Sequence, residues 1–223
     1  ARLVAEGWHL KPMHRLILTS AAYRQAALHP AAEMARGKDP DNRLLWHRTP
    51  RRIEVEPIRD AMLAVSGELD PRAGGPGVDL AQPRRTIYTK IIRNTRDPLL
   101  DAFDAPDGSI TTPLRNVTTT PTQALLMING PWTLARARAF ADRLLREAPD
   151  VPRRVDLAYR LAYGRPPEPT ERAEAEAFLR GPDGPAEIAG CTPADSSQAE
   201  DESSALVDFC HTLLNSNEFL YVD

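Results

Sequence analysis

Proline is the feature that most constrains the fold of this chain. Twenty-one of its 223 residues are proline, nearly double the usual share of about 5%. Proline has no amide hydrogen to donate, and it keeps the residue before it out of the helical conformation. Any helices must therefore be short and joined by stiff, extended segments.

Composition favours an ordinary globular protein. Apolar residues make up 42% of the chain and charged residues 26%, which is enough to build one core, or one core and a small satellite. The formal net charge is only -3, from 28 basic and 31 acidic residues. No large field of one sign exists to attract nucleic acid or an anionic membrane. No apolar run approaches the roughly 20 residues of a membrane span, and we expect any export signal to lie upstream.

Apolar residues recur at helical spacing in many short segments. These segments predict helices over residues 8–23, 53–66, 98–103, 120–129, 131–146, 150–164, 170–179 and 205–214. The fold class predicted is mainly α, a bundle of short helices with one or two short strands and long ordered loops. The predicted domains are a helical core over 1–180, a mobile Gly/Pro/Ser/acidic insert over 181–204, and a C-terminal helix and tail over 205–223 that pack on the core.

Four local patterns give sharper expectations. Thr120 and Gln123 match a capping box, in which each side chain bonds the other residue's amide. Residues 86–92 alternate like a strand, which would pair with an upstream strand or with 117–119. We expect the apolar face of the first helix to point inward, together with Leu44, Leu45 and Trp46 on a turn over 41–46. The long loop 69–85 is a candidate lid or partner contact.

The two cysteines allow two interpretations. Cys210 lies on the apolar face of the last predicted helix, where a buried thiol acting as a small hydrophobe is the commoner arrangement. Cys191 lies in a Gly/Pro-rich loop, and a disulfide between the two is the alternative.

Several longer segments resemble a known family. They include GWHLKPMHRLILTSAAYRQ (7–25), DPDNRLLWHRTPRRIEVEPIRDAMLAVSGELD (39–70), RRTIYTKIIRN (84–94), RNVTTTPTQALLMINGPW (115–132) and LLNSNEFLYVD (213–223). In this order they resemble the planctomycete-specific C-terminal domain of unknown function, which is found in exported multidomain proteins with a cytochrome c-like domain. Pro57 and the acidic insert before Ala205 are modest departures from the family pattern.

The resemblance implies a setting and partners, and it transfers no catalytic residues. It implies an extracytoplasmic location, at the periplasm or cell surface, and upstream domains of the same polypeptide as partners. It also implies haem in an upstream domain of some family members. We therefore expect a non-catalytic packing or partner module linked to surface redox chemistry or polysaccharide processing.

The sequence predicts no cofactor within this chain. Covalent haem attachment needs Cys-x-x-Cys-His, and only Cys210 followed by His211 is present. His14 or His211 could reach a neighbour's haem, although a histidine on a helix is more often structural. The five histidines show no zinc-ligand spacing.

The loop after residue 100 carries the alternative, an enzyme. Asp101, Asp104 and Asp107 offer oxygen ligands to calcium, although their spacing is not that of an EF-hand. Asp104 and Asp107, with Arg115 and Gln123 across the loop, could form a carbohydrate-active or hydrolytic site shared with the upstream domain, because glycoside hydrolysis uses two carboxylates. The plainer interpretation makes both aspartates turn or cap residues.

A second polar group is predicted to be structural. Arg59 and Asp60 lie beside the apolar stripe of one helix, and Arg93 and Asn94 end the predicted strand. We expect these four residues to form a half-buried network. No phosphate loop or nucleophile elbow is present in the sequence.

Overall fold

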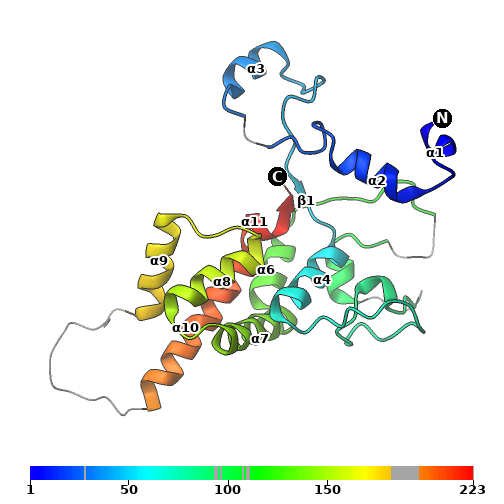
Figure 1. The fold of residues 1–223 in the computed structure, drawn as a ribbon. Helices are drawn as coiled ribbons and strands as arrows, with labels where there is room; N and C mark the ends of the chain where they lie inside the picture. Colours follow the sequence, from blue (N-terminus) through cyan, green and yellow to red (C-terminus); the bar gives the residue numbers. More distant parts are fainter. Residues whose placement is uncertain are drawn as a thin grey trace. The chain divides into compact units, whose positions relative to one another are not determined.

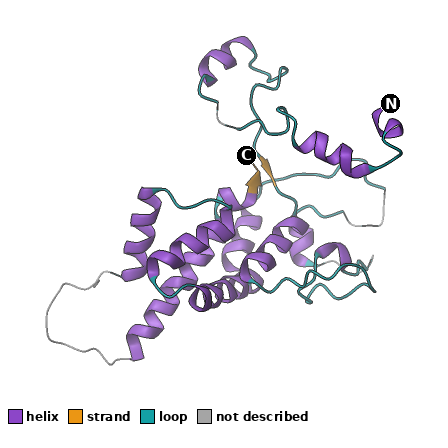
Figure 2. Cartoon of the chain, viewed as in Figure 1, coloured by secondary structure: helices purple, strands orange, loops and turns teal. Residues whose placement is uncertain are grey.

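The chain is mainly helical, as the sequence predicts (Figures 1 and 2). The computed structural model describes residues 1–27, 29–92, 95, 97–106, 108, 111–181 and 196–222, with the backbone alone for 196–202. The chain divides into two compact units. We call Ala1–Arg51 with Tyr221–Asp223 the N-terminal unit, and Arg52–Leu220 the helical unit.

The helical unit is built around one central helix, α7. Its elements are α4 (Val55–Ser66), the 3-10 helix η1 (Thr86–Tyr88), α5 (Pro98–Ala102), α6 (Pro121–Asn129), α7 (Pro131–Glu147), α8 (Val151–Tyr163), α9 (Pro169–Arg180), α10 (Ser196–Asn215) and α11 (Asn217–Leu220). Helix α7 packs against α4, α6, α8 and α10, and α9 packs against α8 and α10 (Figure 1).

An aliphatic and aromatic core joins these helices. Met62 from α4, Phe140 and Leu144 from α7, and Leu206 and Leu214 from α10 are almost completely buried and belong to one cluster. Removing such side chains from water is the main favourable term in folding. The short helices of this unit are therefore stabilised by their shared apolar stripe.

Glycine, proline and a capping box mark the ends of several helices. Gly67 and Gly164 follow α4 and α8 in the left-handed conformation, with φ of 79° and 73°, which glycine adopts without a steric penalty. The predicted capping box of Thr120 and Gln123 is present at the start of α6. Pro57 lies in the first turn of α4, where a missing amide hydrogen costs little.

The N-terminal unit contains α1 (Arg2–Ala5), α2 (Leu10–Leu18) and α3 (Ala32–Lys38). The prediction of a helix near its start is confirmed in part, since α2 lies within 8–23. The expected burial of its apolar face is wrong, because no residue of α2 is buried. The described residues of the unit leave this helix exposed along its length.

The same correction applies to the turn over 41–46. Leu44 and Leu45, expected to point inward, are strongly exposed, whereas Trp46 is half-buried. The reason is local, because hydrogen bonds within the turn direct these two side chains outward, as described below.

The strand predicted over 86–92 is also wrong. Thr86–Tyr88 forms η1, and the neighbouring Thr89 makes only an isolated bridge to Val78. The two short strands lie elsewhere, as β1 (Arg51–Arg52) paired with β2 (Tyr221–Val222) (Figure 2). Alternation failed here because Thr86 is drawn inward by polar contacts with α4, while Ile87 is left exposed.

The last long helix begins earlier than predicted. Helix α10 starts at Ser196, nine residues before Ala205. Cys210 is a free thiol in the structure, so the alternative of a disulfide to Cys191 is not borne out; residues 182–195, which include Cys191, lie outside the described part of the chain. Cys210 is buried in the core.

Candidate functional site

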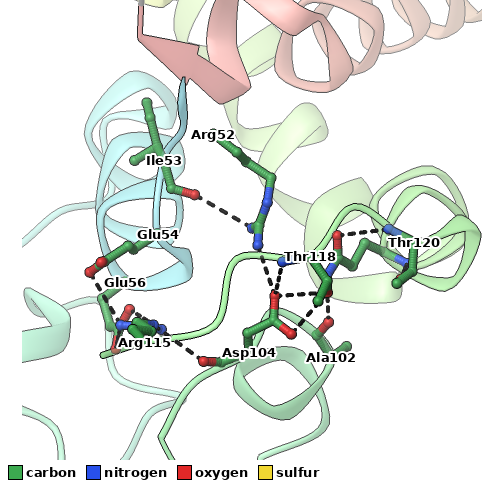
Figure 3. A network of polar contacts seen from close by, with 10 residues as sticks. Arg52, Ile53, Glu54, Glu56, Ala102, Asp104, Arg115, Thr118 and Thr120 are labelled. Carbon is green, nitrogen blue, oxygen red and sulfur yellow. Dashed lines mark hydrogen bonds and ion pairs between the residues drawn. The ribbon is translucent and has the colours of Figure 1, made fainter. Parts of the chain in front are cut away.

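Asp104 is the most densely bonded of the predicted catalytic residues (Figure 3). It follows α5 with φ of 62°, a left-handed conformation that aspartate tolerates better than most residues. Its carboxylate accepts hydrogen bonds from Arg52 Nη2 at 3.1 Å, from the Thr118 amide at 2.8 Å and from the Thr118 hydroxyl at 2.9 Å. The carboxylate therefore joins three separate segments of the helical unit.

These contacts keep Asp104 ionised. Burial alone would raise the pKa of this carboxyl, but the amide and hydroxyl of Thr118 and the charge of Arg52 outweigh it. The net effect holds the pKa of Asp104 below its ordinary value. A general acid needs the opposite shift, toward neutral pH, so Asp104 is poorly suited to donate a proton.

Gln123, on α6, belongs to the same network. Its side-chain amide donates to the Ala102 carbonyl at 3.0 Å and to the Thr118 hydroxyl at 3.2 Å, and its oxygen accepts from the Thr120 amide at 3.3 Å. The residue is buried. It therefore ties α6 to the end of α5, and its donors and acceptor are used within the chain.

Arg115 binds this loop to α4. Its Nε donates to the Asp104 carbonyl at 3.2 Å, and Nη1 donates to Glu54 at 3.2 Å and to Glu56 at 3.0 Å (Figure 3). A second nitrogen, Nη2, lies 2.9 Å from the other oxygen of Glu56. Forked arginine–carboxylate contacts of this kind fix geometry well.

Sequence reasoning missed half of this network. Arg52, Glu54, Glu56 and Thr118 all contribute, and Arg52 also lies over the Phe103 ring at 5.2 Å from its centroid. Arg52 and Asp104 are 52 residues apart, and no local pattern links them. Only the packing of α4 beside α5 brings them together.

Two cavities lie beside the network. The smaller measures about 320 Å³, and its lining consists of Asp101, Asp104, Ala105, Pro106, Thr112, Arg115 and Asn116. The larger measures about 770 Å³ between α4, the segment 80–92 and α5, with Glu56, Asp60, Asp97 and Asp101 among its lining residues. Asp104 and Arg115 thus share a concave surface, whereas Gln123 is buried and does not line either cavity. Asp107 is outside the described residues.

Arg59 and Asp60 belong to a second polar network. Arg59 is buried and donates to the carbonyls of Leu80, Gln82 and Arg84 at 2.5 to 2.9 Å. Asp60 accepts from the amide and hydroxyl of Thr86 at 2.7 and 2.6 Å. Burial lowers the pKa of Arg59, against the opposing effect of Asp60.

This second network has a structural role. It holds the irregular segment 80–86 against α4, where backbone carbonyls would otherwise lack partners. The other predicted members, Arg93 and Asn94, lie outside the described residues.

No metal centre is evident in the described ranges. None of their His, Cys, Asp and Glu side chains gather in a group of three or more that could hold an ion. The carboxylate oxygens of Asp104 accept hydrogen bonds from Arg52 and Thr118. Asp107 lies outside the described ranges, so the calcium site stays a prediction. Over the same residues, no helix is both long and apolar enough to cross a membrane.

Fold and site together define a mainly α module whose most conspicuous polar clusters hold its own loops in place. The chain belongs to the PSD1 family, described as a protein of unknown function (DUF1553), whose model matches residues 1–179. No curated protein and no solved structure matches the chain.

Proposed function

We propose that this chain is a non-catalytic packing and partner module of a larger exported protein, in which upstream domains of the same polypeptide are its partners. The observation that carries the proposal is the lack of an apolar core in the N-terminal unit. Among its described residues, no apolar side chain is buried, while Trp8, Leu10 and Ile17 are strongly exposed.

Helix α2 makes the need for a partner specific. It has nine residues, and isolated helices shorter than about 12 to 15 residues are marginal in water. Its apolar residues lie mainly on one side, which is the pattern of a helix packed against something. An exposed apolar surface of this kind is typical of an interaction site.

The state of the predicted catalytic residues supports a non-catalytic role. The Asp104 carboxylate and the Gln123 amide are engaged by partners within the chain. A catalytic group needs a free position to meet substrate.

The setting we propose follows the sequence resemblance. It is surface redox chemistry or polysaccharide processing in an exported planctomycete protein, with haem held by an upstream cytochrome c-like domain.

Hydrogen exchange tests the proposal directly. We expect the amides of α2 to exchange rapidly in residues 1–223 alone and slowly in the native polypeptide that carries them, while α7 exchanges slowly in both. Equal exchange of α2 in both proteins would contradict a partner module.

A matched pair of variants localises the effect. Ile17 and Phe178 are 51% and 52% exposed, but Ile17 lies in the N-terminal unit and Phe178 in the helical unit. In the native polypeptide, Ile17→Asp should abolish the protection of α2, and Phe178→Asp should leave it intact.

One observation favours the hydrolytic alternative. Asp101 and Asp104 line the smaller cavity with Arg115 and Asn116, so an upstream domain could complete a carbohydrate site there. Asp101→Asn would then abolish glycan hydrolysis by the native polypeptide, and Asp142→Asn, an exposed substitution on α7, would not. We expect neither variant to change hydrolysis. A screen of the same protein for binding to glycans and to redox partners distinguishes polysaccharide processing from surface redox chemistry.

A further inference from the structure

Two adjacent leucines project from the N-terminal unit. Leu44 is 82% exposed and Leu45 is 62% exposed. We call this pair the leucine tip. Single exposed apolar residues are common on protein surfaces, whereas these two leucines are neighbours on a turn that internal hydrogen bonds hold in place.

Asp39 holds the turn that carries the leucine tip. Asp39 is buried, and its carboxylate accepts the amides of Arg43 at 3.0 Å and Leu44 at 2.7 Å. Its carbonyl accepts the indole N–H of Trp46 at 2.9 Å. These bonds close the turn around its own polar groups and leave the leucine side chains outside.

Further bonds fix the turn to the rest of the unit. The Asn42 side chain bonds the carbonyl of His47 at 2.8 Å and its amide at 3.3 Å. Gln25 donates to the Trp46 carbonyl at 2.6 Å. The leucine tip is therefore presented by an ordered turn.

The backbone of this turn is strained. Asn42 and Leu45 have φ of 51° and 54°. Asparagine tolerates this conformation, but leucine adopts it at a cost in free energy. Strain of this kind persists where the surroundings over-determine it, and it is concentrated at functional sites.

The charge around the leucine tip is positive. Arg36, Lys38 and Arg43 are exposed, and Asp41 is the one exposed acidic residue between 36 and 48, a range that the structure describes completely. Residues 1–51 contain nine Lys and Arg against four Asp and Glu, whereas the remaining 172 residues contain 19 against 27. The small net charge of the whole chain conceals this division.

We propose that the leucine tip docks into an apolar pocket on a protein surface whose rim carries carboxylates. This inference rests on the proposed function, since it names the chemistry of the partner that covers the N-terminal unit. Leucines supply apolar burial at the centre of the contact, and the surrounding cations supply complementarity at its edge.

The fixed turn favours a protein pocket over a membrane. A pocket rewards a side chain that is already held in the bound geometry, because less conformational freedom is lost on binding. A fluid bilayer accepts an exposed leucine in any geometry and gives no reason to hold Leu45 in a strained one.

Photo-cross-linking in the native polypeptide tests this inference. A benzoylphenylalanine replaces Leu44 in one variant and Met34 in a matched control, because Met34 is also strongly exposed and lies in the same unit. Cross-linked peptides are mapped by mass spectrometry. We expect the probe at position 44 to join one protein segment in which Asp and Glu outnumber Lys and Arg, with a yield about tenfold above that at position 34.

Charge and apolar contributions are separated by further variants. Lys38→Glu with Arg43→Glu should lower the yield at position 44 about tenfold, and added salt should lower it in the unmodified charge background. In a protein with the probe at position 17, Leu44→Ser should weaken cross-linking to the partner, and Met34→Ser should not.

Each other outcome overturns the inference. Cross-links from position 44 to lipid, or co-sedimentation of residues 1–223 with vesicles of phosphatidylcholine and phosphatidylglycerol that is lost in Leu44→Ser, would assign the tip to a membrane. Cross-links to a basic segment, or none above the control, would also contradict it. If α2 is still protected from hydrogen exchange in that case, the partner module stands and only the leucine tip is wrong; if α2 is unprotected as well, both proposals fail.

Discussion

The two compact units differ in how much apolar surface they bury. In the helical unit, side chains from α4, α7 and α10 share a buried apolar cluster. Among the described residues of the N-terminal unit, the buried one is Asp39, whose hydrogen bonds organise a turn while apolar side chains face outward. The helical unit can therefore be stabilised by its own packing, whereas the N-terminal unit has the composition of a folded region without the burial that normally accompanies it.

Polar networks also differ between the units. In the helical unit, the side chains of Arg59 and Asp104 form hydrogen bonds with backbone groups of irregular segments and so hold these segments against the helices. These networks lie next to a hydrophobic core, which excludes water and makes each lost bond costly. In the N-terminal unit, the hydrogen bonds of Asp39 to backbone amides hold a turn on which Leu44 and Leu45 are exposed to solvent.

The comparison predicts the largest effect in the core of the helical unit. Phe140 is 0% exposed, and Phe140→Ala should lower the free energy of unfolding by about 3 to 5 kcal/mol, because it leaves a cavity. Phe178→Ala, on the exposed face of α9, should cost well under half as much. Urea denaturation measures both variants, and similar losses would show that α7 is not the centre of the core.

The next largest effect is expected at Arg59. Arg59→Met fills a similar volume but leaves the carbonyls of Leu80, Gln82 and Arg84 without their donor. We expect a loss of about 3 kcal/mol and faster hydrogen exchange over the segment 80–86. Arg85→Met is the control, since Arg85 is exposed and lies 3.7 Å from Asp60; it should change stability by about 0.5 kcal/mol or less.

Asp104 should contribute a smaller, pH-dependent stability. Its pKa is lower in the folded state than its ordinary value, so its contribution is complete above the unfolded carboxyl pKa of about 3.9 and is lost as pH falls through the folded value. Asp104→Asn should cost about 1 to 2 kcal/mol at pH 7. Unfolding curves from pH 7 to pH 2 should converge for the two proteins at low pH, and a constant difference would argue against the ionised carboxylate.

The smallest effect on stability is expected in the N-terminal unit. Ile17→Ser in residues 1–223 alone should change the free energy of unfolding by about 0.5 kcal/mol or less, because the side chain is already exposed. Circular dichroism during denaturation measures this. A loss comparable with that of Phe140→Ala would remove the contrast between the units and the need for a partner.

Local sequence rules predicted the helical unit well. Proline and glycine marked the ends of α4, α6 and α8, and helical spacing identified the faces of α7 and α8 that are buried. Capping and turn chemistry act between neighbours in the chain, so sequence alone contains the required information. The segment 86–92 was misread because Thr86 bonds to Asp60 of α4, a residue remote in sequence, and local alternation carries no sign of such a contact.

The candidate site was predicted only in part. Asp104, Arg115 and Gln123 do lie close together, yet their partners Arg52, Glu54, Glu56 and Thr118 carried no recognisable pattern. An aspartate in a loop looks the same in sequence whether it meets solvent, a substrate or a buried arginine. Its role depends on which groups approach it from elsewhere in the chain.

The sequence by itself determined where helices begin and end, that they are short, and that their apolar stripes could build a mainly α bundle. Tertiary structure decided which of those stripes are covered. Helices α2 and α7 both have an apolar face. That of α7 is buried against its neighbours, whereas no residue of α2 is buried, because burial depends on long-range packing that spacing along a helix does not encode.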